Sequence, residues 1–159
     1  MKKMMLLAVA IFGFTAFGFA QQISKNAIGL RIGDNNGVGT EISYQRALNK
    51  NRLEIDLGWR DNKEYDAFKL TGLYQWVRNL DKGFNWYFGV GGGFGSYSFH
   101  KEYDFNDDES FAFAAGDVGI EYNFEIPLMI SLDFRPELGF SDYNDDLDFD
   151  IAFGIRYQF

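Results

Sequence analysis

The last twelve residues constrain the fold most, because they alternate strictly between large apolar side chains and polar or small ones. In an extended strand successive side chains point to opposite faces, so one face of residues 148–159 is entirely apolar. That face carries Phe149, Ile151, Phe153, Ile155, Tyr157 and Phe159. Chain ends usually fray in water, which makes a wholly apolar terminal strand unusual there. The pattern predicts a strand whose apolar face meets lipid.

The same period of two recurs along the chain, in segments separated by turn residues, which is typical of an all-β protein. We expect eight strands, at about 26–33, 37–46, 52–60, 66–78, 84–98, 111–124, 128–140 and 148–159. We expect these strands to form an eight-stranded antiparallel up-and-down transmembrane β-barrel, whose membrane location depends on which face lies inside.

Two strands contain irregularities. Phe111 and Phe113 are out of phase with Val118 and Ile120, so we expect a β-bulge near residues 114–116 to reset the register. Pro136 lacks a backbone donor and should produce a second bulge or a bend.

The connections alternate in length. Short turns are expected at 47–51, 79–83 and 125–127, and longer, mostly acidic loops at 61–65, 99–110 and 141–147. The first connection, 33–37, is short for a loop on its side. Short turns at one end and longer loops at the other are typical of outer-membrane barrels. An even number of strands places both chain ends at the turn end.

The decisive question is which face lies inside the barrel. The interior of an eight-stranded barrel is just wide enough for its side chains, so it cannot hold the apolar face with its many large residues. The other face combines many glycines with charges of both signs, which suits a narrow lumen. We expect its cations to pair with carboxylates: Arg31, Arg60, Lys69, Arg135 and Arg156. We expect such pairs to plug most of the lumen, with a gated pore as the alternative, and a soluble apolar-cored barrel is the rival architecture.

Aromatic residues gather at two levels of the predicted barrel. One group lies near the turns: Tyr44, Trp76, Trp86, Tyr122, Phe124, Tyr157 and Phe159. The other lies near the loops: Trp59, Phe68, Phe94, Phe140 and Phe149. Two aromatic girdles around an aliphatic band are expected where rings meet the two membrane interfaces.

Residues 1–20 read as a cleaved export signal, with Lys2 and Lys3 before an apolar stretch and small residues before Gln21. Cleavage leaves one domain, 21–159, and removes two of 15 basic residues but none of 23 acidic ones, so the net charge moves from −8 to −10. A charge of this sign argues against nucleic acid and against electrostatic docking on anionic lipid. The chain has no cysteine and therefore no disulfide framework.

Other chemical motifs are weak. Ser98, His100 and Glu102 share strand parity, so a lipid-modifying triad is conceivable, but no oxyanion donors are evident and a solvated histidine is the preferred interpretation. The acidic run 104–109 starts like a calcium loop, yet it has Glu109 where glycine is required and Ala115 where glutamate is required. It could gather divalent cations that bridge lipopolysaccharide, or form a solvated rim. We expect no metal site, cofactor or catalytic residue.

With these features the chain resembles the small outer-membrane β-barrel superfamily, of the OmpX and OmpA transmembrane-domain kind. In that superfamily the last strand carries an assembly signal, and Gly154, Tyr157 and Phe159 match it, whereas Ala152 departs from its polar first position. The resemblance implies a diderm (Gram-negative) bacterium, periplasmic chaperones, the barrel assembly machinery, and a final place among outer-membrane lipid and lipopolysaccharide with both termini periplasmic. It does not imply a particular activity. We expect a structural or surface-interaction role, with a narrow channel or a lipid A-modifying enzyme as alternatives.

Overall fold

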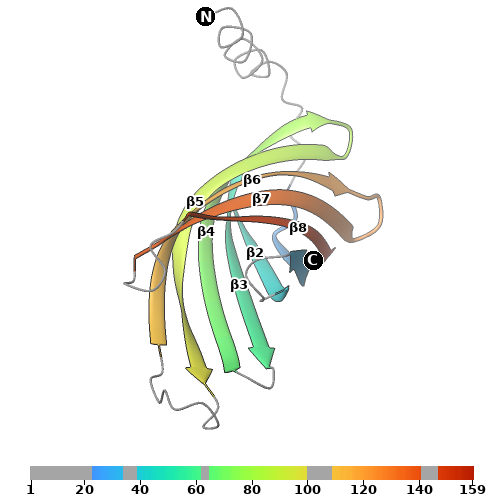
Figure 1. Cartoon of the computed structure of the whole chain (residues 1–159). Helices are drawn as coiled ribbons and strands as arrows, with labels where there is room; N and C mark the ends of the chain where they lie inside the picture. Colours follow the sequence, from blue (N-terminus) through green and yellow to red (C-terminus); the bar gives the residue numbers. More distant parts are fainter. Residues whose placement is uncertain (1–22, 34–38, 62–64, 100–108, 141–146) are drawn as a thin grey trace, which may run out of the picture.

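Eight antiparallel strands form a single closed barrel in the computed structural model (Figure 1), which describes residues 23–33, 39–61, 65–99, 109–140 and 147–159. The strands are β1 (Asn26–Gly33), β2 (Thr40–Leu48), β3 (Asn51–Asp61), β4 (Tyr65–Asp81), β5 (Phe84–Phe99), β6 (Glu109–Asn123), β7 (Leu128–Gly139) and β8 (Leu147–Gln158). Each strand pairs with the next along the chain, and β8 pairs with β1 to close the barrel. The predicted fold class is therefore confirmed. No helix in the described ranges is long and apolar enough to cross a membrane.

The turn end of the barrel is tightly built. Asn49, in the β2–β3 turn, and Gly83, in the β4–β5 turn, have positive φ angles of 59° and 80°, which asparagine and glycine tolerate best. The start of β1 and the last residue also meet here, because Asn26 and Phe159 exchange two backbone hydrogen bonds of 2.9 Å. At the other end, β3 and β4 extend further than expected, so residues 62–64 alone connect them, instead of the predicted loop 61–65.

The predicted bulge near residues 114–116 is wrong. The β5–β6 register runs without a shift from Phe84↔Tyr122 to Tyr97↔Glu109. Pro136 does interrupt the β6–β7 ladder, but the register is the same on both sides of it, so no bulge forms there either. Its ring instead faces Gly116, where an added Cβ would lie 3.2 Å from the proline Cγ.

Phe113 is out of phase because it points into the barrel, where it is 5% exposed. Its register partner is Gly93, and an added Cβ there would lie 2.6 Å from the Phe113 ring. Tyr87 and Gly119 form a second pair of this kind, since a Cβ on Gly119 would lie 2.5 Å from the Tyr87 ring. These glycines on β5 and β6 make room for inward aromatic rings.

The two faces of the sheet have opposite chemistry. Large apolar side chains on the outer face are exposed, for example Ile151 (63%) and Trp59 (58%). The inner face buries polar and charged groups, including four arginines at 2% exposure or less. The outer aromatics stack on neighbouring strands, as Trp76 does on Phe88 with ring centroids 5.2 Å apart. The distribution is the reverse of that in a soluble barrel, whose core is apolar.

Candidate functional site

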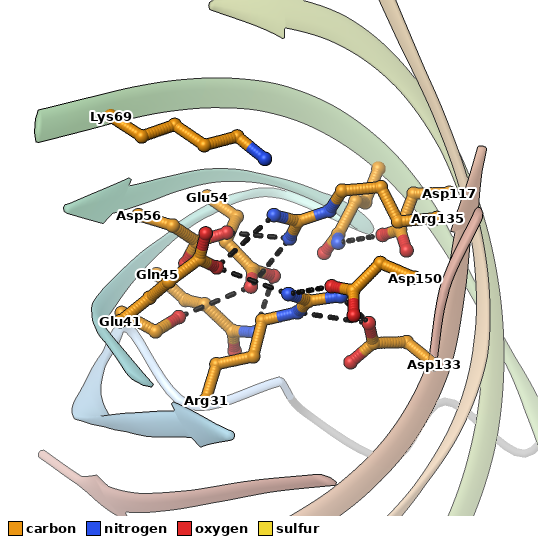
Figure 2. Close-up of polar contacts among 12 residues, drawn as sticks. Arg31, Glu41, Gln45, Glu54, Asp56, Lys69, Asp117, Asp133, Arg135 and Asp150 are labelled. Atoms are coloured by element: carbon orange, nitrogen blue, oxygen red, sulfur yellow. Dashed lines mark hydrogen bonds and ion pairs between the residues drawn. The ribbon is translucent and has the colours of Figure 1, made fainter. Parts of the chain in front are cut away.

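The lumen, the interior of the barrel, is crossed by a network of buried ion pairs (Figure 2). Arg31 on β1 lies where the barrel closes, so carboxylates from three other strands reach it. Its Nη2 donates to Asp133 Oδ1 (2.5 Å), and its Nη1 donates to Asp150 Oδ2 (2.6 Å) and Glu41 Oε2 (3.1 Å). Glu41 is also the register partner of Arg31. Strand closure thus surrounds one guanidinium with three carboxylates.

Arg135 reaches across the lumen from β7 toward β2 and β3 (Figure 2). Its Nη2 donates to Asp56 Oδ2 at 2.6 Å, and its Nη1 donates to Glu41 Oε2 at 3.3 Å. Glu41 therefore accepts from both Arg31 and Arg135, which joins the two clusters. Removing either arginine would leave buried carboxylates with fewer compensating charges.

Arg156 on β8 extends the network toward the turn end. It donates to Glu54 Oε1 at 2.7 Å and to the hydroxyls of Ser43 and Ser131 at 2.9 and 2.8 Å. Gly154 leaves space for this arrangement, because an added Cβ would lie 2.4 Å from Arg156 Nη1 and 2.3 Å from Ser131 Oγ. Gly154 thus has a packing role of its own.

Arg52 forms a further cluster with residues from β4, β5 and β6. Its Nη1 donates to Glu121 Oε2 and its Nε donates to Gln75 Oε1, both at 2.5 Å. Its guanidinium carbon lies 4.5 Å from the centroid of the Tyr87 ring. Gln75 in turn donates to Asp117. The ring contact and the hydrogen bonds together fix the position of the Arg52 guanidinium in the lumen.

Lys69 belongs to the half of β4 nearer the loops. Its Nζ donates to both oxygens of Glu137, at 2.6 and 2.8 Å, and lies 4.9 Å from the centroid of the Phe113 ring. Leu73, Phe113 and Ala115 form a small buried apolar cluster, with Phe111 packed against it. Both ionic and apolar side chains therefore fill the lumen.

The buried charges do not balance. Among the described residues, eight carboxylates and five cations are buried. Asp117 is the one buried carboxyl in that set that forms no ion pair within 4.0 Å. Five buried side-chain atoms in the described part have no hydrogen-bond partner: Arg52 Nη2, Asp56 Oδ1, Thr71 Oγ1, Asp117 Oδ1 and Arg135 Nε. The lumen is thus negative overall and incompletely hydrogen-bonded by protein groups.

The sequence-predicted site residues lie as follows. Arg31, Lys69, Arg135 and Arg156 are buried in the lumen and ion-paired, whereas the side chain of Arg60 lies outside the described residues. Gly154 is buried, and Tyr157 and Phe159 are on the outer face, where their rings stack with centroids 6.2 Å apart.

The loop motifs lie mostly beyond the described residues. Ser98 is on β5, but His100, Glu102, the acidic run up to residue 108 and the export signal are all outside the described ranges. Within those ranges no group of three or more His, Cys, Asp or Glu side chains could hold a metal ion.

Sequence reasoning placed Arg52 on the polar face but did not name it among the cations expected to pair. It also missed the inward apolar residues Leu73, Val77, Tyr87 and Met129. Parity could have identified Tyr87, because it alternates with Asn85 and Gly89 on the polar face of its strand. The sequence-based description of the inner face named only glycines and charged residues, so the large apolar side chains that also fill the lumen were not identified.

Comparison with known proteins connects this architecture to solved structures. No protein-family model and no curated protein sequence matches the chain. The N-terminal β-barrel domain of Pseudomonas aeruginosa OprF matches with a TM-score of 0.72 at 12% identity, covering 87% of this chain and 100% of that one. Neisserial surface protein A matches at 0.60 and 10% identity, covering 84% of this chain and 94% of its own. Ail, the attachment invasion locus protein of Yersinia pestis, matches at 0.60 and 18%, covering 86% and 97%. At these identities the likeness shows a shared fold.

Proposed function

We propose that this chain is a small integral outer-membrane barrel with a closed lumen, both termini on the periplasmic side, and a structural or surface-interaction role. The observation that carries the proposal is the inverted distribution of side chains, with arginines buried inside and large apolar residues exposed outside. Water would disfavour such an exterior, whereas the bilayer core favours it. The shared fold with barrels such as the OprF domain supports the same place in a diderm envelope, among outer-membrane lipid and lipopolysaccharide.

The filled lumen argues for a plug and against a catalytic role. Ion pairs join β1, β2, β3, β7 and β8 across the interior. A conducting barrel would need a continuous wet path past these groups. The excess of buried carboxylates favours one second candidate, a narrow cation path.

Planar-bilayer recording separates the two candidates. We expect the reconstituted chain to show no steady conductance, because arginine side chains span the lumen. The matched variant is Arg135→Ala, which removes an arginine that crosses the lumen to Glu41 and Asp56, and it should raise conductance if the ion pairs form the plug. Steady, cation-selective current through the unaltered chain would contradict a closed lumen and support the channel.

The surface role would belong to the loops, whose chemistry is acidic. The segment 100–109 has one lysine and five acidic residues, and 141–148 has four acidic residues and no basic one. Ail has been solved in complex with a heparin analogue, sucrose octasulfate. Sulfated ligands carry many negative charges, so we propose that the loops of this chain instead select cationic partners or divalent cations bridged to lipopolysaccharide.

We propose further that Gly154, Tyr157 and Phe159 are read by the barrel assembly machinery after periplasmic chaperones deliver the chain. Gly154 and Phe159 also have structural contacts, which any test must separate from recognition. A side-chain change at Phe159 can keep its two backbone hydrogen bonds to Asn26.

Phe159→Ala is expected to reduce assembly several-fold, measured as the heat-modifiable folded fraction in the outer membrane. Phe149→Ala is the matched control, because both rings are on the outer face and are exposed to 58% and 59% respectively. Loss of one lipid-facing ring costs both variants a similar amount. If Phe159→Ala and Phe149→Ala assemble to the same extent, Phe159 is not part of an assembly signal.

A further inference from the structure

The amino-acid sequence segregates charges between the two ends of the barrel. At the turn end the described residues include five exposed basic side chains, which we call the basic rim: Lys25, Arg46, Lys50, Arg78 and Lys82. Exposed acidic side chains there are Asp81 and Glu125. The loop-end segments 34–38, 61–66, 100–109 and 141–148 contain thirteen acidic and two basic residues. The net charge of −8 therefore conceals a positive turn end.

Two members of the basic rim project from the outer wall itself. Arg46 shares the outward face of β2 with Ile42 and Tyr44, and its Nη1 donates to Asn26 Oδ1 at 2.8 Å. Arg78 on β4 is the register partner of Trp86, and its Nη1 donates to the carbonyl oxygen of Val77 at 2.8 Å. Neither guanidinium forms an ion pair with a described carboxylate within 4.0 Å.

The aromatic residues around these arginines set their depth. Tyr44 precedes Arg46 by two residues, and Trp76 and Trp86 flank Arg78 on the outer face. Aromatic girdles lie at the level of lipid headgroups, and arginine stems beside them can extend the cationic head to that level. In a membrane barrel both guanidinium groups would therefore lie at the height of lipid phosphates.

We propose that the basic rim binds the headgroup phosphates of anionic phospholipids in the leaflet at the turn end. This inference rests on the proposed membrane function, because it needs the outer face to contact lipid. It revises the expectation, drawn from net charge, that the protein has no electrostatic affinity for anionic lipid. Exposed charges further apart than about 10 Å are screened at ordinary ionic strength. The basic rim can therefore attract anionic lipid although the protein as a whole is negatively charged.

Lipid selectivity of the reconstituted full chain tests the proposal. In phosphatidylcholine vesicles, spin-labelled phosphatidylglycerol and spin-labelled phosphatidylcholine each report the fraction of lipid immobilised at the barrel wall. In Arg46→Gln/Arg78→Gln we expect the phosphatidylglycerol-to-phosphatidylcholine association ratio to fall about threefold or more below that of the unaltered chain. The charge-conserving control Arg46→Lys/Arg78→Lys should keep the ratio.

The outcomes are distinguishable. If the glutamine variant keeps the unaltered ratio, the basic rim does not select anionic lipid, and the proposal is overturned while the barrel remains a membrane protein. If the association ratio falls as far in the lysine variant as in the glutamine variant, charge is not the cause of the selectivity, and the proposal also fails. If no immobilised lipid appears with either probe, the chain does not contact a bilayer and the proposed function itself is wrong.

Discussion

Replacing Arg31 by methionine is expected to lower the free energy of unfolding by about 3–5 kcal/mol, the cost of breaking a buried ion pair by removing one partner. The arginine is 2% exposed and donates to three carboxylates. Methionine fills similar volume without charge, so the loss comes from the carboxylates left behind. Glu41 keeps Arg135 as a partner, whereas Asp133 has no other described cation within 4.0 Å, which concentrates the loss on Asp133.

Urea titration in detergent, followed by tryptophan fluorescence and by heat-modifiability on gels, measures this change. Arg46→Met is the control for removing an exposed arginine and should change stability by no more than about 0.5 kcal/mol. Adding Asp133→Asn to Arg31→Met should restore part of the loss, because the carboxylate charge that Arg31 compensated is then removed. Equal effects of Arg31→Met and Arg46→Met would contradict a stabilising lumen network.

Placing an arginine at Leu132 on the outer wall is expected to cost about 2–4 kcal/mol in vesicles, the penalty for a cation near the bilayer midplane. Leu132 is 53% exposed, lies near the middle of β7, and has Ile120 and Phe153 as register partners. The same change at Leu48, which is 40% exposed at the turn end of β2, should cost about 0–1 kcal/mol, because the penalty falls toward the interface.

Equilibrium unfolding in vesicles of both variants gives the comparison. The informative quantity is the difference in lost free energy of unfolding between Leu132→Arg and Leu48→Arg. Both positions face outward and receive the same substitution, so the difference reports depth in the bilayer. In a soluble barrel, an exposed leucine replaced by arginine should change stability by about 0.5 kcal/mol or less at either position. Equal small effects at Leu132 and Leu48 would therefore favour the soluble alternative.

The strands and the choice of inner face were predictable from the sequence. The alternation of polar and apolar residues fixes the orientation of every strand, because a register slip of one residue would move all of its polar side chains from the lumen to the outer face. The terminal strand illustrates this, because Phe149 to Phe159 are outward in the structure at every second position. Short connections then limit each strand to pairing with its neighbours along the chain, and in the structure β8 also pairs with β1.

The partners of individual charges were not predictable, because they depend on closure. Arg31 contacts Asp133, which is 102 positions away in the sequence. The carboxylate comes within reach of the arginine only when β8 joins β1, because β7 is then separated from β1 by β8 alone. Charge composition indicates that pairs must form, but the register determines which ones.

The bulge prediction failed for a different physical reason. The prediction assumed that every large aromatic residue faces lipid. Phe113 could then reach the outer face only if a bulge shifted the alternation of β6. The structure instead gives Phe113 the space above Gly93, its register partner on β5. A glycine directly across from an aromatic residue on the polar face was the signal available in the sequence, although using it requires the strand register.

Single-cysteine labelling along β8 tests the central claim, that the apolar face meets lipid, most directly. The chain has no cysteine, so each introduced thiol is unique. Bimane at Ile151, Phe153 or Ile155 in folded, reconstituted protein should be quenched strongly by dibrominated phosphatidylcholine, and bimane at Lys50 in the β2–β3 turn only weakly. Weak quenching at the three β8 positions, equal to that at Lys50, would contradict a lipid-facing wall.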